Sequence, residues 1–259
     1  MKIRLIHQLA RSGGTLINRL LLAQGVAVLS EVHPLGWATL DPLAQARDWF
    51  GLIGAGDLEG RDGLPHAEAI ALIATKARRR KRPLVIRDWS HLDFMPIGMG
   101  LKPAQRSMQA EMLADRFDLR RVATVRHPLD QWLSLAAMLG AEGRPPRQAE
   151  LEHWLDGTEA FAAMAAATGF VRYEEITADP ASGMEDLCRK LDLPFDPGRL
   201  EGWRDVTSFS TGGVPGRAAA STRIERLEPR PAPPHLLHRL NRDRRYRQAL
   251  DLLGYTVRK

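Results

Sequence analysis

The stretch that most constrains the fold is residues 3–22, IRLIHQLARSGGTLINRLLL. An apolar run from Ile3 to Leu9 precedes a short segment with two glycines, and apolar residues then recur at helical spacing from Leu16 to Leu21. This pattern predicts a strand, a glycine turn and a helix. The first N–H groups of a helix have no partners within the helix, and the helix dipole adds positive potential there. The turn is therefore suited to bind an anion such as a phosphate.

Three side chains in this turn strengthen the anion-site interpretation. Arg11 adds a fixed positive charge, and Ser12 and Thr15 add hydroxyl donors. The turn is not a Walker A loop, because it contains no Gly-Lys-Ser/Thr sequence. On these residues alone, the alternative is an ordinary strand–helix turn with two glycines and a serine cap.

Apolar runs alternate with amphipathic segments along the rest of the chain. Further strands are expected at residues 26–29, 83–87, 119–125 and 169–173. Helices are expected at residues 43–53, 66–81, 103–117, 128–139, 151–167, 179–191 and 234–253, and loops at residues 92–103 and 207–234. The alternation is continuous and has no internal repeat. It predicts a single α/β domain over residues 1–259, with a central parallel sheet flanked by helices.

The charge of the chain favours an anionic ligand. The 259 residues carry a formal net charge of +6, and the pI is about 9.9. A nucleic acid, an acidic glycan and a phosphorylated cofactor all fit this excess. We interpret the basic run at 78–82 as the last turn of a helix, where it complements the helix dipole. No aromatic residue interleaves this run, as binding to single-stranded nucleic acid would require.

Cysteine content and hydropathy argue against disulfide-bonded, cysteine–metal and membrane-spanning proteins. Cys188 is the single cysteine, so an intrachain disulfide and a cysteine metal site are excluded. Its place on the apolar side of a helix predicts that it is buried. The N-terminus has no signal-peptide pattern, and no uninterrupted apolar run reaches 18 residues. We therefore expect a cytoplasmic protein without a membrane span.

Polar residues follow two of the expected strands. Glu31 and His33 come at the end of the second strand, and Asp88 and His91 follow the third. Because ligands of α/β sheets bind at the carboxyl ends of the strands, these side chains are candidates for acid–base chemistry. Polar loop residues or helix caps are the alternative interpretation.

A second motif, RHPLDQWLS, follows the fourth strand at residues 126–134. Pro128 fits the first turn of a helix, and Asp130 and Ser134 then share a face of that helix. Arg126, at the strand end, can reach the same anion as Ser134, and a guanidinium with a hydroxyl suits a terminal phosphate. The alternative is a structural salt bridge between Arg126 and Asp130.

The two motifs in this order resemble those of the sulfotransferase superfamily. Its members use the sulfonate donor PAPS (3′-phosphoadenosine-5′-phosphosulfate) on a three-layer α/β fold with a P-loop-NTPase-like parallel sheet. The resemblance implies that the segment from Arg11 to Thr15 holds the 5′-phosphosulfate. It also implies that Arg126 and Ser134 hold the 3′-phosphate.

Two further segments agree with this resemblance. Residues 172–176, RYEEI, resemble the family's RYE segment, whose tyrosine, here Tyr173, lies near the adenosine. The stretch around Gly216 and Arg217 resembles the loop that closes on the nucleotide, here about 207–234, ahead of a C-terminal helix at about 234–253.

The first motif departs from the family pattern, which commonly reads P-[KR]-S-G-T-T. Ala10 replaces the proline, and Gly14 replaces the first threonine. One hydroxyl donor is lost, although backbone N–H groups can still serve.

The resemblance implies transfer of a sulfonate group from PAPS to a hydroxyl or amine, with 3′,5′-ADP as the product and no metal. Sulfuryl transfer depends on positioning and electrostatics, as phosphoryl transfer does. Arg11 is expected to stabilise charge on the bridging oxygen. The N–H groups expected to hold the 5′-phosphate are those of Ser12, Gly13, Gly14, Thr15 and Leu16.

A general base must take the proton of the acceptor. Our first choice is Glu31, which ends the strand beside the donor loop and matches a glutamate in similar branches of the superfamily. His33 and His91 are the alternatives, followed by Asp88. Histidine needs no large pKa shift to act near neutral pH, whereas glutamate needs a raised pKa or strong positioning.

Two other functions compete with this one. A kinase-like ATP phosphotransferase shares the strand–loop–helix but needs the lysine that the loop lacks. A non-catalytic basic module that binds nucleic acid or acidic glycan explains the charge but not the two anion motifs. We expect a small-molecule or glycan acceptor and no nucleic-acid partner. The sequence does not set the acceptor's identity or the oligomeric state.

Overall fold

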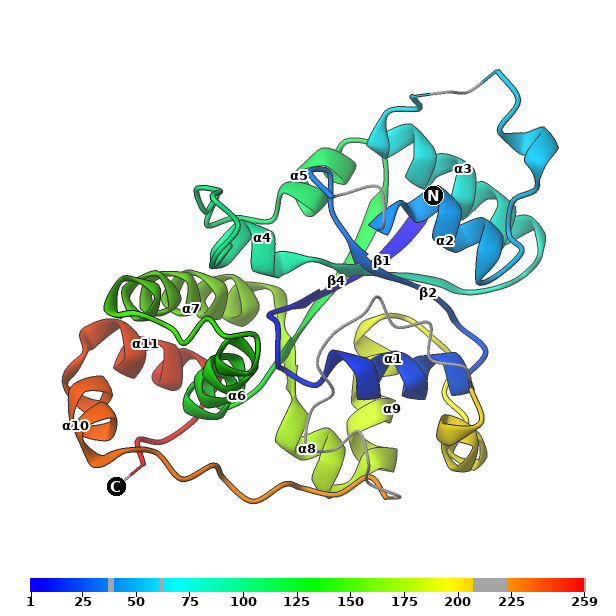
Figure 1. The fold of residues 1–259 in the computed structure, drawn as a ribbon. Helices are drawn as coiled ribbons and strands as arrows, with labels where there is room; N and C mark the ends of the chain where they lie inside the picture. The colour runs from blue at the N-terminus through cyan, green and yellow to red at the C-terminus, as the bar shows by residue number, and fades with distance from the viewer. Residues whose placement is uncertain (37–39, 61–62, 207–222, 259) are drawn as a thin grey trace.

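A parallel sheet forms the centre of the protein in the computed structural model, which describes residues 1–36, 40–60, 63–206 and 223–258 (Figure 1). Within these residues the sheet has five strands in the order β2-β3-β1-β4-β5, and every neighbouring pair is parallel. The strands are β1 (Lys2–Gln8), β2 (Ala27–Val32), β3 (Leu84–Asp88), β4 (Asp118–Val125) and β5 (Phe170–Arg172).

Helices cover both faces of this sheet, so the predicted three-layer α/β fold is confirmed (Figure 1). In the first half of the chain they are α1 (Gly14–Ala23), α2 (Pro42–Asp48), the 3₁₀ helix η2 (Ala55–Asp57), α3 (His66–Arg79), α4 (Ser90–Phe94) and α5 (Met108–Ala114). In the second half they are α6 (Pro128–Ala141), α7 (Gln148–Thr168), α8 (Tyr173–Ala178), α9 (Pro180–Lys190), the 3₁₀ helix η3 (Pro197–Arg204), α10 (Pro234–Arg242) and α11 (Arg244–Leu253).

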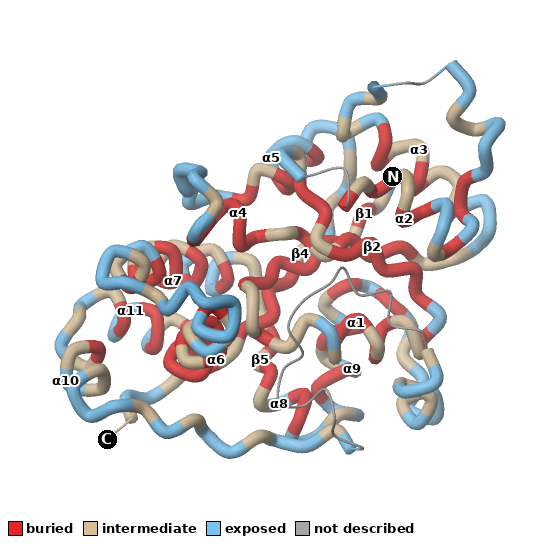
Figure 2. The backbone as a smooth tube through the Cα atoms, in the orientation of Figure 1, coloured by how far each residue is buried: buried red, intermediate tan, exposed pale blue. Residues whose placement is uncertain are grey.

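Alternate residues of the central strands enter separate hydrophobic clusters. Leu5 and Ile86 pack with α2, α3 and α5, whereas Ile6 and Val85 pack with α1 and α9. Side chains of a strand point alternately to its two faces, so these strands are apolar on both. Figure 2 shows the resulting pattern, in which buried residues follow the sheet and the inner sides of the helices. Cys188 is buried in the second of these clusters, as predicted.

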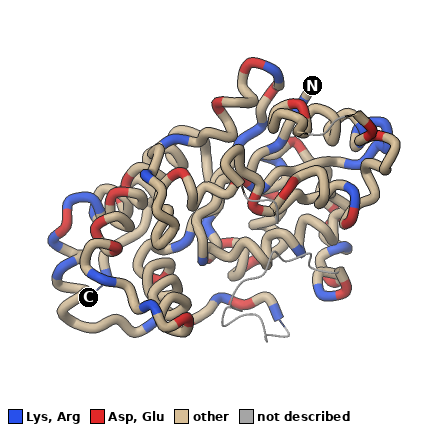
Figure 3. Tube along the Cα trace, turned by 45° about the horizontal axis from the view of Figure 1, so that its top comes forward, with Lys and Arg blue, Asp and Glu red and all other residues tan. Residues whose placement is uncertain are grey.

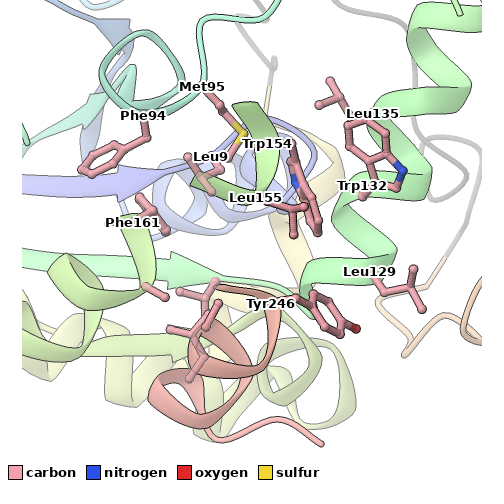
Figure 4. Close-up of a cluster of buried hydrophobic side chains, with 14 of the residues drawn as sticks. Leu9, Phe94, Met95, Leu129, Trp132, Leu135, Trp154, Leu155, Phe161 and Tyr246 are labelled. Atoms are coloured by element: carbon pink, nitrogen blue, oxygen red, sulfur yellow. The ribbon is translucent and has the colours of Figure 1, made fainter. Parts of the chain in front are cut away.

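A third cluster lies beyond the end of β4, among α4, α6, α7 and α11 (Figure 4). Trp132 of α6 and Trp154 of α7 meet there with ring centroids 5.2 Å apart, and Trp154 also faces Tyr246 of α11. Aromatic side chains of this size bury large apolar areas. The cluster therefore fixes α6, which follows β4, against the rest of the molecule.

The structure differs from the predicted elements at several places. The helix expected at 234–253 is two helices, because Asp243 leaves the helical conformation and caps α11 through the N–H groups of Arg245 and Tyr246. A short helix, α8, follows β5 directly, and α4 begins before the loop expected at 92–103. Residues 207–222 of the expected closing loop lie outside the described part of the chain.

The basic run at 78–82 ends α3, whose last turn contains Lys76, Arg78 and Arg79, as the dipole interpretation predicts. Acidic and basic residues are otherwise interspersed over much of the chain (Figure 3). None of the helices in the described ranges is long and apolar enough to cross a membrane.

Gly157, in the middle of α7, allows α7 to approach α4 closely. A Cβ atom at this position would overlap the carbonyl oxygen of Phe94. We expect Gly157→Ala to lower the free energy of unfolding by about 1–3 kcal/mol through this overlap, although alanine is the better helix former. Urea unfolding followed by circular dichroism measures the change. Gly140→Ala in α6, where a Cβ meets no atom within 4 Å, is the matched control and should be neutral or stabilising by up to about 1 kcal/mol. Equal effects of the two substitutions would contradict this account.

Candidate active site at the carboxyl edge of the sheet

The two motifs meet at the topological switch point of the sheet, between β1 and β4. β1 and β4 are neighbours, with Gln8 opposite Thr124, so both strands end at the same level of the sheet. The chain leaves β1 toward β2 and leaves β4 toward β5, on opposite sides of this pair. Such a switch point is where open α/β sheets bind their ligands. The loop after β1 and the segment after β4 therefore lie side by side at the carboxyl edge of the sheet, at this switch point.

The segment that follows β1, residues 9–16, which we call the anion loop, comprises the turn after β1 and the first residues of α1. Gly13 is the N-cap of α1 at φ 91°, and no side chain of the described residues caps the helix. Ser12 therefore does not cap the helix, contrary to that detail of the ordinary-turn alternative. Arg11 also has a positive φ, 69°, which is uncommon for a residue with a side chain. Backbone of this kind costs energy and tends to occur at functional sites.

Arg11, Arg126 and Ser134 come together beside this loop. The Nε atom of Arg11 donates to the Oγ atom of Ser134 at 3.1 Å, and Nη1 of Arg126 donates to the carbonyl oxygen of Arg11 at 3.1 Å. Burial lowers the pKa of the Arg11 guanidinium, and the positive charge of Arg126 lowers it further. Two partly buried cations that repel each other form a favourable site for an anion.

Asp130 does not pair with Arg126, so the salt-bridge alternative is wrong. Its carboxylate accepts hydrogen bonds from Arg258 and from the backbone N–H of Arg230 at 2.9 Å. Burial alone would raise the pKa of Asp130, but these hydrogen bonds outweigh it and the pKa lies below its usual value. Arg126 instead lies over the ring of Tyr173, 5.1 Å from its centroid.

Side chains from other segments lie close to both glycines of the loop. A Cβ atom at Gly13 would overlap the ring of Tyr173. A Cβ atom at Gly14 would overlap Nη1 of Arg87 and lie 2.6 Å from Oε1 of Gln8. The departure at position 14 thus makes room for an arginine from β3 beside the anion loop.

Arg87 links the anion loop to Glu31. Its Nη2 atom lies 3.0 Å from a carboxylate oxygen of Glu31 and also donates to Ser30. Glu31 lies inside β2, at φ 56°, where the register with β3 shifts. A bulge of this kind redirects a side chain. Glu31, the predicted base, is thus paired with an arginine that itself lies beside the anion loop.

The two histidines differ in their surroundings. His33 is buried, and both ring nitrogens are used: Nδ1 accepts from the N–H of Leu35 at 3.0 Å, and Nε2 donates to Asp93 at 3.1 Å. His91 is buried as well, and burial lowers its pKa to about 4, so the imidazole is neutral at physiological pH. Within the described residues the Nδ1 atom of His91 has no hydrogen-bond partner.

Asp88 belongs to a buried hydrogen-bond network. One carboxylate oxygen accepts from His7 at 2.7 Å, from Ser90 at 2.9 Å and from Ser107 at 3.2 Å. The hydroxyl of Ser90 in turn accepts from the N–H of Gln8 at the end of β1. Asp88 therefore joins β1, α4 and the start of α5 to one another.

The sequence missed Gln8 and Arg87 as site residues. Arg87 precedes Asp88 at the end of the third strand, and the rule that drew attention to Asp88 also applies to Arg87. No local pattern indicates that Gln8 reaches back to the loop. Gly216 and Arg217 lie outside the described residues, and Thr15 is exposed on the first turn of α1.

Comparison with known proteins agrees with this geometry. Residues 104–197 match the model of a family described as the sulfotransferase family, a span that includes Arg126, Ser134 and Tyr173 but not the anion loop. No curated protein matches the chain by sequence.

Two solved structures share the fold over the whole chain. The sulfotransferase domain from the Synechococcus PCC 7002 olefin synthase aligns with a TM-score of 0.62 and 18% identity, covering 100% of this chain and 96% of that one. The sulfotransferase domain from the curacin biosynthetic pathway aligns with a TM-score of 0.51 and 17% identity, covering 99% of each chain. The family match over residues 104–197 and the shared fold confirm the predicted resemblance to the sulfotransferase superfamily.

Proposed function

We propose that the protein transfers a sulfonate group from PAPS to a hydroxyl or amine of an acceptor. The observation that carries the proposal is the convergence of Arg11, Arg126 and Ser134 beside the open N-terminus of α1. A helix N-terminus and two guanidiniums suit a ligand with two separate anionic groups, which is what a 3′,5′-bisphosphorylated nucleoside provides.

Each residue has a role in this proposal. The N–H groups of residues 12–16 hold the 5′-phosphosulfate, and Arg126 and Ser134 hold the 3′-phosphate. Tyr173, which packs on Gly13 and Arg126, forms the floor between the two groups. Arg11 bonds Ser134 in this structure and reaches toward the bridging oxygen when the donor is bound. Its positive charge then stabilises the negative charge of the leaving phosphate.

In the transfer, the bond from sulfur to the bridging oxygen breaks and a bond from sulfur to the acceptor oxygen or nitrogen forms. The proton of the acceptor passes to a base, and 3′,5′-ADP is released. We assign the base to Glu31. Its carboxylate lies at the bulge of β2, paired with the Arg87 that lies beside the loop. The nitrogens of His33 are both engaged, and Asp88 already accepts three hydrogen bonds, which favours Glu31 over either.

Binding of 3′,5′-ADP tests the donor site. A ligand that binds only the folded state raises the apparent stability, so 3′,5′-ADP should raise Tm while ADP and 5′-AMP give smaller shifts. Arg126→Ala should weaken 3′,5′-ADP binding by at least about tenfold in calorimetry, because a charged partner of the phosphate is lost. Arg120→Ala is the matched control, because Arg120 lies on β4, which ends just before Arg126, and its exposed side chain is 3.8 Å from Asp118.

The other nucleotides separate the competing functions. A Tm shift with ADP as large as that with 3′,5′-ADP would favour a kinase-like phosphotransferase. No shift with any of the three nucleotides would favour a non-catalytic module and contradict the proposal.

Substitution of Glu31 tests the assignment of the base. We expect Glu31→Gln to lower kcat by about 10²–10⁴-fold, because the amide cannot take the proton, while the affinity for 3′,5′-ADP stays within about threefold. Release of 3′,5′-ADP from PAPS in the presence of a panel of phenols, alcohols and amines measures the rate. His33→Asn and His91→Asn are compared in parallel. A loss of turnover in His91→Asn without one in Glu31→Gln would move the assignment to His91.

A further inference from the structure

Three consecutive carbonyl groups of the anion loop each accept a hydrogen bond from a side chain. The carbonyl oxygen of Ala10 accepts from Nε2 of Gln131 at 2.7 Å. The carbonyl of Arg11 accepts from Arg126 at 3.1 Å, and that of Ser12 accepts from Nε2 of Gln8 at 3.1 Å. The peptide bond is planar and trans, so each C=O points opposite to the N–H of the next residue. These three hydrogen bonds therefore fix the directions of the N–H groups of residues 11–13.

Gln131 is the most firmly held of the three donors. It lies on α6, one turn after Pro128, and only 2% of it is exposed. Its Oε1 atom accepts a hydrogen bond from the indole N–H of Trp154 on α7. With that oxygen engaged, the amide group is oriented so that its nitrogen faces Ala10. Figure 4 shows the position of Trp154 in the cluster beyond β4, beside Trp132 and Leu155.

The backbone conformation of the anion loop needs support of the kind that the contact between Gln131 and the Ala10 carbonyl provides. Arg11 and Gly13 both have positive φ. This conformation is unfavourable for Arg11 because it has a side chain, so the surrounding structure must hold it in place. Alternation of left-handed and other residues directs successive N–H groups to one side and creates a concavity that binds anions. Such a concavity binds well only if its geometry is held in advance of the ligand.

We infer that Gln131 is a positioning residue, which holds the anion loop in the conformation that binds the 5′-phosphate of the donor. The inference rests on the proposed function and extends it to a residue that contacts no ligand in that scheme. The chain of contacts runs from the Trp154 indole through the Gln131 amide to the Ala10 carbonyl. It thereby makes the large apolar cluster of α6 and α7 the support of the donor site.

The test compares three nucleotides on wild type and Gln131→Met, which keeps the length of the side chain but loses the amide. Calorimetry is used with 3′,5′-ADP, with 5′-AMP and with adenosine 3′-monophosphate, which lacks the 5′-phosphate. We expect about tenfold weaker binding of the two nucleotides with a 5′-phosphate, and a change within twofold for adenosine 3′-monophosphate. Equal weakening of all three, or of none, would overturn the inference.

Gln24→Met is the matched control for lost stability. Gln24 is another buried glutamine, and both of its amide atoms bond the backbone of Asp196, at 2.9 and 3.0 Å. It caps the far end of α1, away from the anion loop. We expect Gln24→Met to lower Tm as Gln131→Met does, without selective loss of the nucleotides that carry a 5′-phosphate.

Trp154→Phe is the second variant, for use where Gln131→Met does not fold. It keeps an aromatic ring in the cluster but removes the N–H that orients Gln131, so we expect a smaller selective loss of about two- to fivefold. Wild-type protein that binds none of the nucleotides would overturn the proposed function and the inference together. Wild-type protein that binds 3′,5′-ADP, with variants that bind it as tightly, would overturn the role of Gln131 alone.

Discussion

The parallel pairing of β1 with β4 is the constraint on which the candidate site depends. The two strands run in register from Lys2 opposite Asp118 to Gln8 opposite Thr124, so their carboxyl ends coincide. This register brings Arg11 and Ser134 into hydrogen-bond contact, although 123 positions separate them in the chain. A shift of one residue would turn every side chain of β4 to the other face of the sheet. Because both faces are apolar and covered by helices, the packing of the core holds the register, and through it the site.

Uncharged groups contact both arginines of the site. Arg126 is fixed by a backbone carbonyl and an aromatic ring, and Arg11 is bound to a hydroxyl. The acidic residue nearest to Arg126 in sequence, Asp130, forms its ion pair with Arg258. Burial of cations beside one another is costly in an empty protein. An anionic ligand beside the two guanidiniums would offset that cost.

The sequence was sufficient for features that depend on local periodicity and on the ends of strands. It predicted the α/β class, the strand–turn–helix at the N-terminus, Pro128 in the first turn of α6 and the polar groups after the strands. It could not identify partners that come from distant segments. The pairing of Asp130 with Arg258 joins residues 128 positions apart. The approach of the Arg87 guanidinium to Gly14 depends on the pairing of β1 with β3. The register shift that places Glu31 at positive φ also arises only when β2 pairs with β3.

The polar residues at the carboxyl edge divide into those that support the fold and those that remain suited to chemistry. Both ring nitrogens of His33 and one carboxylate oxygen of Asp88 are engaged by partners within the protein, and burial makes those partners necessary. Glu31 differs, because its partner Arg87 is a cation that itself borders the anion loop. In the proposed reaction, Arg87 would therefore lie between the anion loop and the carboxylate of the proposed base, and would connect the two by direct contacts.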